Sequence, residues 1–144
     1  MDIDHIVDLD RYPLDRPDSA GYQTLVAACQ DDLRADGCAV VADLVRPAAL
    51  GAMSAESHAI NHATHYSETK INAYFGTEPD PTLPAEHPGN IFIERSSGFT
   101  PGDAFPDGSP IDAMYRWSPL LAFVADCLEI PELFCYADPL ACLT

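Results

Sequence analysis

The sequence is poor in positive charge. It contains one lysine and six arginines against 23 aspartates and glutamates, which gives a formal net charge of −16 at pH 7. Such a surface repels phosphate backbones and anionic lipid, so we expect neither a nucleic-acid nor a membrane partner. Solubility is the simplest interpretation of the charge. Because cations are so few, each arginine in the folded part raises the question of what it pairs with.

Long apolar runs and paired cysteine motifs are also missing. No apolar run approaches the roughly 20 residues that a membrane-spanning helix needs. The acidic N-terminus lacks the basic and apolar regions of a signal peptide. The five cysteines form no CxxC pair and have apolar neighbours, which indicates buried, reduced thiols. We therefore expect a cytoplasmic protein.

The chain of 144 residues has the length and composition of one globular domain. Residues 1–18 are rich in aspartate and proline and predict an extended N-terminal arm, which leaves residues 19–144 as the folded portion. A first helix is predicted from Ser19, a good N-cap, to Gly37, a good C-cap. A second helix is predicted from Pro47, because proline suits the first helical position, to about residue 65.

The remaining pattern predicts short strands, one more helix and a long loop. Residues 38–45 are apolar and β-branched, and residues 90–98 alternate apolar and polar side chains, so both segments predict strands. Residues 110–130 predict a third helix. The end of the chain predicts a buried strand from residue 132, a break at Asp138-Pro139 and the start of a further strand. The proline-rich loop before residue 90 is of the long, ordered kind that often belongs to a functional site.

Three histidines lie within eight residues and suggest a metal site. On a helix, His58, His62 and His65 would form one stripe, because they are spaced i, i+4 and i+7. His58 and His65 would then be about 10 Å apart along the axis, too far to share one ion. No glutamate lies between the first two, as it does in the HExxH motif. We interpret the stripe as a polar flank and assign no metal ligand, although a two-histidine site completed elsewhere, or a substrate contact, stays open.

Four linked segments carry a resemblance to a known family. They are "DLRADGCAVVADLVRPAAL", "NAYFGTEPDPTLPAEHPGN", "ERSSGFTPGDAFPDGSPIDAMYRW" and "ELFCYADPLACLT". Their order resembles the N-terminal part of the Fe(II)- and 2-oxoglutarate-dependent oxygenases that include the free-amino-acid radical halogenases and their hydroxylase relatives. The resemblance covers nearly all of residues 20–144.

The resemblance implies an α+β chain in which N-terminal helices precede the first strands of a double-stranded β-helix, a cupin-like jelly roll. In that family a His-x-Asp or His-x-Gly motif and a distal histidine hold the iron in a facial arrangement. A downstream arginine anchors 2-oxoglutarate. The first metal histidine of such relatives follows the segment that resembles residues 132–144, so the metal-binding half would be missing here. We therefore expect no catalytic residue in this chain, and neither Fe(II) nor 2-oxoglutarate bound by residues 1–144 alone.

The substrate side of the family site has counterparts in this chain. Arg95 resembles the position that binds the substrate carboxylate, a task that suits a bidentate guanidinium. Asp138 resembles an acidic position that faces the substrate amine. Structural roles stay open for both: Arg95 could instead pair with Glu94 or Asp103, and Asp138 could begin the turn before Pro139.

Three residues of the long loop are weaker substrate-binding candidates. They are Asn72, Tyr74 and His87, for which packing within the loop is the competing interpretation.

Two functions of different classes follow. The first is the N-terminal portion of a non-haem iron dioxygenase, a hydroxylase or halogenase of a free amino acid or similar small polar substrate, inactive as this fragment alone. The second is a non-catalytic α/β binding or interaction module, complete at 144 residues, whose proline-rich loop contacts a partner. The sequence leaves the substrate, the reaction outcome and the oligomeric state open.

Overall fold

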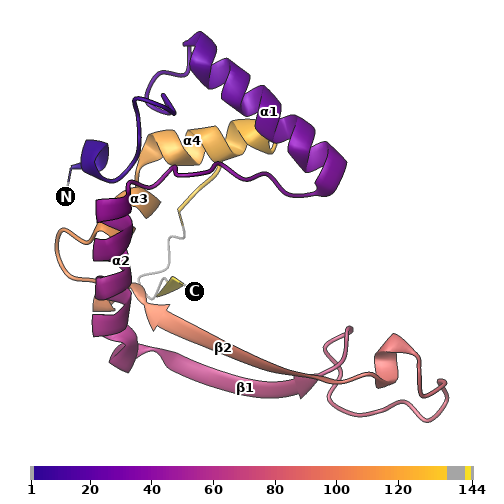
Figure 1. Ribbon diagram of the computed structural model, residues 1–144. Helices are drawn as coiled ribbons and strands as arrows, with labels where there is room; N and C mark the ends of the chain where they lie inside the picture. The colour runs from indigo at the N-terminus through magenta and orange to yellow at the C-terminus, as the bar shows by residue number, and fades with distance from the viewer. Residues whose placement is uncertain (1, 136–141, 144) are drawn as a thin grey trace.

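The computed structural model describes residues 2–135 and 142–143 (Figure 1). It contains helices and one antiparallel sheet, which confirms the α+β class. In chain order the elements are η1 (Ile3–His5), α1 (Ala20–Asp36), α2 (Pro47–Ile60), η2 (Asn61–Ala63), β1 (His65–Ile71), η3 (Pro88–Asn90), β2 (Ile93–Pro101), η4 (Gly102–Ala104), α3 (Pro110–Tyr115), α4 (Ser118–Cys127) and β3 (Cys142–Leu143), where η denotes a short 3₁₀ helix.

The helices gather in one part of the molecule, and strands β1 and β2 extend away from them as a long ribbon (Figure 1). Helix α1 packs on α4, and α2 packs on α3. A long loop joins the two strands at the far end of the ribbon (Figure 1). The apolar core therefore lies among the helices, and the ribbon receives little support from it.

The N-terminal segment is part of the core. The sequence predicted an extended arm over residues 1–18, but the segment folds as η1 and a series of turns. Its side chains at Ile6, Val7, Leu9 and Leu14 are buried, and they pack with buried residues of the helices. Apolar burial of this kind stabilises a buried aliphatic side chain by about 1.5–3 kcal/mol. The apolar residues between the aspartates, rather than the aspartates and prolines, decide the conformation.

The first predicted helix is confirmed at both ends. The Ser19 hydroxyl accepts a hydrogen bond from the Tyr22 amide at 3.2 Å, as an N-cap does. Gly37 ends the helix with φ 69°, a left-handed conformation that glycine adopts without strain.

The predicted strand at residues 38–45 is wrong. Val45 forms only an isolated bridge with Val7, and the rest of the segment is irregular. Val40 is 79% exposed, whereas Ala39 and Val41 are partly buried against the core. The segment has the β-branched composition of a strand, but along most of its length it has no neighbouring strand among the described residues. It therefore forms no strand despite its high β propensity.

The other helices differ from the prediction in length. Helix α2 begins at Pro47 as predicted, but it ends at Ile60 and is followed by η2 and then β1. The predicted third helix is split, because α3 ends at Tyr115 and α4 begins at Ser118. Pro119 explains the split, because it has no amide hydrogen to donate to the carbonyl four residues earlier and is tolerated only in the first turn of a helix.

The sheet has the order β1-β2-β3 and is antiparallel. Strands β1 and β2 pair along their length, from His65 opposite Phe99 to Ile71 opposite Ile93. The predicted strand at residues 90–98 is confirmed as β2, and the predicted final strand is confirmed as β3, which pairs with β2 at Thr100 and Pro101 alone. Residues 132–135 contain no strand, and the rest of the strand predicted there lies outside the described residues. Strand β1 was not predicted.

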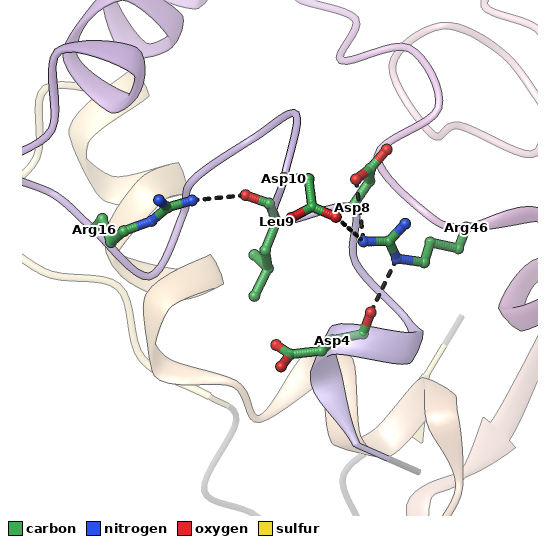
Figure 2. A network of polar contacts seen from close by, with 6 residues as sticks. All are labelled: Asp4, Asp8, Leu9, Asp10, Arg16 and Arg46. Atoms are coloured by element: carbon green, nitrogen blue, oxygen red, sulfur yellow. Dashed lines mark hydrogen bonds and ion pairs between the residues drawn. The ribbon is translucent and has the colours of Figure 1, made fainter.

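Arg46 joins the N-terminal segment to the start of α2 (Figure 2). Its Nε donates to the Asp4 carbonyl at 2.9 Å, and its Nη2 lies 3.2 Å from an Asp8 carboxylate oxygen and 3.1 Å from one of Asp10. The backbone beside it is paired as well, since the Arg46 amide donates to the Ile6 carbonyl at 2.8 Å. The guanidinium thus holds together a loop of acidic residues that would otherwise repel one another.

Tyr22 joins α1 to α4. Its ring is buried and meets Phe123 edge-on, with ring centroids 6.0 Å apart. Its hydroxyl donates to the Asp126 carboxylate at 2.6 Å. Burial, together with the hydrogen bond to the negative charge of Asp126, raises the pKa of Tyr22 well above its usual range. The phenol therefore keeps its proton in the folded state under conditions in which an exposed tyrosine would lose it.

We expect Arg46→Ala to lower the free energy of unfolding by about 1–2 kcal/mol, because one side chain loses contacts with three acidic residues. Urea denaturation measures the change. Arg116→Ala is the matched control, because Arg116 makes one exposed pair, with Asp112, at the C-terminal end of α3. Its loss should cost at most about 0.5 kcal/mol. Equal effects of the two substitutions would contradict the junction role of Arg46.

We expect Tyr22→Phe to lower stability by about 1 kcal/mol near neutral pH, through loss of the hydrogen bond to Asp126. Since folding raises the Tyr22 pKa, its contribution is fully present below the unfolded pKa of about 10 and is lost as pH rises through the folded value. The difference between wild type and Tyr22→Phe should therefore shrink between about pH 8 and about pH 11. Urea denaturation at both pH values tests this, and a difference that grows with pH would refute it.

Candidate functional site

Most cations of this acidic chain are bound to carboxylates. Five of the seven form ion pairs: Arg11 with Asp43, Arg16 with Asp15, Arg34 with Asp31 and Glu129, Arg46 with Asp8 and Asp10, and Arg116 with Asp112. Within residues 2–135 and 142–143, Lys70 and Arg95 make no ion pair. Both unpaired cations lie on the β1–β2 ribbon, which makes the ribbon the candidate site.

The register places the two cations next to each other. Lys70 is opposite Glu94, and Arg95 is opposite Thr69. Because successive side chains of a strand alternate between faces, Lys70 and Glu94 share one face of the ribbon with Glu68, while Arg95 leaves from the other face. The cations therefore flank the ribbon rather than point at one another.

A hollow of about 370 Å³ lies at this part of the ribbon. It is lined by the residues of three consecutive cross-strand pairs, namely Glu68, Thr69, Lys70, Glu94, Arg95 and Ser96. These residues supply two cations, two carboxylates and two hydroxyls. Lys70, Glu68, Glu94 and Ser96 belong to one face of the ribbon and Arg95 and Thr69 to the other, so each face carries a charged group that can bind one end of a zwitterion.

Arg95 is exposed on β2, and its guanidinium pairs with neither Glu94 nor Asp103 among the described residues. A guanidinium without an internal partner has all its donors available to a ligand or to water. Asp138, the other main candidate for substrate binding, lies outside the described residues.

Asn72 organises the loop at the end of the ribbon. It is buried, and its side-chain amide donates to the Gly89 carbonyl at 2.6 Å. Its side-chain oxygen accepts from the amides of Tyr74 at 2.9 Å and Gly76 at 2.8 Å. All these contacts lie within the loop, so the structure gives Asn72 a role in loop packing.

Tyr74 and His87 lie together in the same loop. Their rings are stacked, with centroids 6.2 Å apart and planes 20° apart. His87 Nδ1 accepts from the Gly89 amide at 3.0 Å, so a neutral ring carries its proton on Nε2. The structure thus brings the three loop candidates together around Gly89 and the stacked rings. No hydrogen bond or ion pair joins them to Arg95 in the described part of the chain.

Asn90 and Asp80 tie down the middle of the loop. The Asn90 side chain donates to the carbonyls of Asp80, Leu83 and Pro84 at 2.9–3.1 Å and accepts from the Asp80 amide at 2.7 Å. The Asp80 carboxylate accepts from the hydroxyl and amide of Thr82, and these bonds lower its pKa. Hydrogen bonds of the asparagine side chains, rather than an apolar core, therefore hold the loop in its conformation.

The predicted histidine stripe is wrong, because the three residues fall on three different elements. His58 lies in the last turn of α2, His62 in η2 and His65 at the start of β1. The Nδ1 atoms of His58 and His62 are bonded to the carbonyls of Ser54 and Ala59 at 2.6 and 2.9 Å. Over residues 2–135 and 142–143, no three His, Cys, Asp or Glu residues come together as a metal site would require.

Sequence reasoning missed the site residues of β1, namely Glu68, Thr69 and Lys70, together with Glu94 and Ser96 of β2. The signal available was the single lysine, which is rare enough in this sequence to merit attention. It was hidden because residues 66–70 show no apolar alternation that would predict a strand. Only the pairing of β1 with β2 brings Lys70 beside Arg95.

Comparison with known proteins gives no relative: no family model, no curated protein and no solved structure matches the chain. Among the described helices, none is long and apolar enough to cross a membrane.

We expect Asn72→Ala to speed amide hydrogen exchange at Tyr74 and Gly76 by roughly tenfold or more, because both amides lose their acceptor. Asn72→Asp should preserve both bonds, since the carboxylate oxygen still accepts, and should lose only the donor to Gly89. Exchange followed by NMR distinguishes the variants. Thr82→Ala, in the same loop, is the control and should leave the two amides unchanged; equal loss of protection in the control would contradict the role of Asn72.

Proposed function

We propose that this chain is the N-terminal portion of a non-haem Fe(II)- and 2-oxoglutarate-dependent oxygenase, a hydroxylase or halogenase that acts on a free amino acid or a similarly small polar molecule. In this proposal the helices precede the first strands of a double-stranded β-helix, with β1 and β2 among them. The order of the four segments quoted above supports the family. The chemistry of the ribbon supports the substrate class.

The unpaired Arg95 is the observation that carries the substrate proposal. In a chain with 23 acidic residues, an arginine normally finds an internal carboxylate, as five other cations do. Arg95 has none among the described residues, so its fork of N–H donors is available for a bidentate bond to a ligand carboxylate. The role of Arg95 in this proposal is to bind and orient the amino-acid carboxylate.

The ammonium end of such a substrate needs a carboxylate. Glu68 and Glu94 also line the hollow, but their side chains leave from the face of the ribbon opposite to that of Arg95, so they do not meet the other end of a small ligand held by Arg95. Asp138, the acidic position implied by the family resemblance, is therefore the candidate for this contact. Together Arg95 and Asp138 would select a zwitterion over an amine or a simple acid, because each alternative leaves one charged group without a partner.

The iron does not fit the described residues, which gather no three His, Cys, Asp or Glu side chains. In this proposal the role of the described residues is to bind the substrate.

A second candidate, a non-catalytic interaction module, is favoured by the tip of the ribbon. Tyr74 and Phe75 are 67% and 73% exposed there, and Phe75 has φ 62°. A bulky residue in the left-handed region is strained. An exposed aromatic pair on a strained, well-ordered loop is suited to contact a partner.

The reading frame beyond the codon for Thr144 separates the two candidates. We expect a His-x-Asp or His-x-Gly motif shortly after it if the proposal is right. A stop codon at that point would favour the interaction module.

In the product of the whole reading frame, we expect succinate to form from 2-oxoglutarate when Fe(II) and a suitable free amino acid are supplied. Arg95→Gln should raise KM for the amino acid by roughly ten- to a hundredfold, the effect of losing a charged hydrogen bond. The KM of Arg95→Lys should fall between those of wild type and Arg95→Gln, because lysine keeps the charge but not the bidentate geometry. Arg34→Gln, which removes a paired arginine on α1, is the control. An unchanged KM in Arg95→Gln would refute the assigned role.

A further inference from the structure

Strand β1 is the edge of the sheet. Its outer edge pairs with no strand in the described part of the chain, because the strand order is β1-β2-β3. The ribbon has two strands along most of its length, since β3 pairs with β2 at only two positions. A two-stranded ribbon is marginal in water, and three or more strands are needed for independent stability. The ribbon also exposes large apolar side chains, with Tyr66 at 63% and Ile93 at 61%.

The ribbon differs in charge from the rest of the molecule. Its paired residues include two cations, Lys70 and Arg95, and two carboxylates, Glu68 and Glu94, and so are neutral overall. The net charge of −16 therefore arises entirely outside these residues. Two copies of the chain repel each other over most approaches, and the repulsion is weakest at the ribbon.

We propose that two copies of this chain pair along β1. The strands run antiparallel about a two-fold axis at Thr69 and form one continuous sheet, with four strands along most of its length. Each copy supplies its β1 at the centre and its β2 on the outside. The pairing satisfies the free backbone groups of both β1 edges, as strand addition at a sheet edge does. This inference does not rest on the proposed function, because it uses the outer edge of β1 and not the guanidinium of Arg95.

Charge complementarity selects this register. With Thr69 on the axis, Glu68 lies opposite the partner's Lys70, and by symmetry Lys70 lies opposite the partner's Glu68. Both cross-strand pairs are then of opposite charge, which stabilises an antiparallel pair.

The neighbouring registers are worse. An axis at Glu68 places two glutamates opposite each other, and an axis at Lys70 places two lysines opposite each other; like charges in directly opposite positions destabilise a sheet. An axis at Ser67 pairs neither charged residue with an opposite charge. The alternation of glutamate, threonine and lysine in residues 68–70 is thus self-complementary only about its central residue.

Charge reversal at β1 tests the pairing in the chain of residues 1–144. Sedimentation equilibrium at about 0.15 M salt, which screens the repulsion between the two acidic copies, should show a dimer in equilibrium with the monomer. Glu68→Lys and Lys70→Glu should each weaken the dimer by roughly tenfold or more, since each places two like-charged pairs across the interface. The double variant Glu68→Lys with Lys70→Glu should restore the dimer, because opposite charges again face each other.

Glu132→Lys is the matched control. It makes the same change in net charge as Glu68→Lys on an exposed residue outside β1, and it should not weaken the dimer. Circular dichroism confirms that each variant is folded. The proposal is overturned by a wild-type monomer at every concentration, by single reversals that leave the dimer intact, or by a double variant no better than the single ones.

Discussion

The shortage of positive charge is the constraint on which the arrangement of this molecule depends. The chain has seven cationic side chains and 23 carboxylates, so most carboxylates have no cation with which to pair. Three of the five paired arginines, Arg11, Arg34 and Arg46, join segments that are distant in sequence. Arg46 holds the N-terminal segment against the start of α2, and Arg34 links α1 to Glu129 beyond α4. An exposed pair contributes little alone, but a guanidinium shared among several acidic groups also removes their mutual repulsion.

The apolar core explains why these links matter. Buried side chains of the N-terminal segment, α1 and α4 form most of the core, with one contribution from α2 at Ala49. The N-terminal segment has no long helix or strand of its own, so it depends on burial of its aliphatic residues and on backbone bonds beside Arg46. By contrast, both faces of the β1–β2 ribbon are largely exposed to solvent, and few of its residues are buried. Stability is therefore concentrated among the helices, and the ribbon is the part best placed to respond to a ligand or a second chain.

Local signals were predicted well because their physics is local. The Ser19 cap, the Gly37 cap and the start of α2 at Pro47 each depend on a few adjacent residues, and all three are confirmed. The signal for the break between α3 and α4 was also present, in Pro119, but the apolar periodicity on both sides hid it. Strand β1 could not be predicted in the same way, because its residues alternate between two exposed faces and show no apolar pattern.

The sequence by itself determined the acidic character, the helix caps and the presence of an arginine at position 95. Each of these follows from residue identity or from neighbours within a few positions. Only the tertiary structure decided that residues 38–45 are not a strand, that the histidines lie on separate elements, and that Lys70 lies beside Arg95. The reason is that strand pairing joins residues distant in the chain. A pairing partner, unlike a cap or a proline, cannot be read from the segment that needs it.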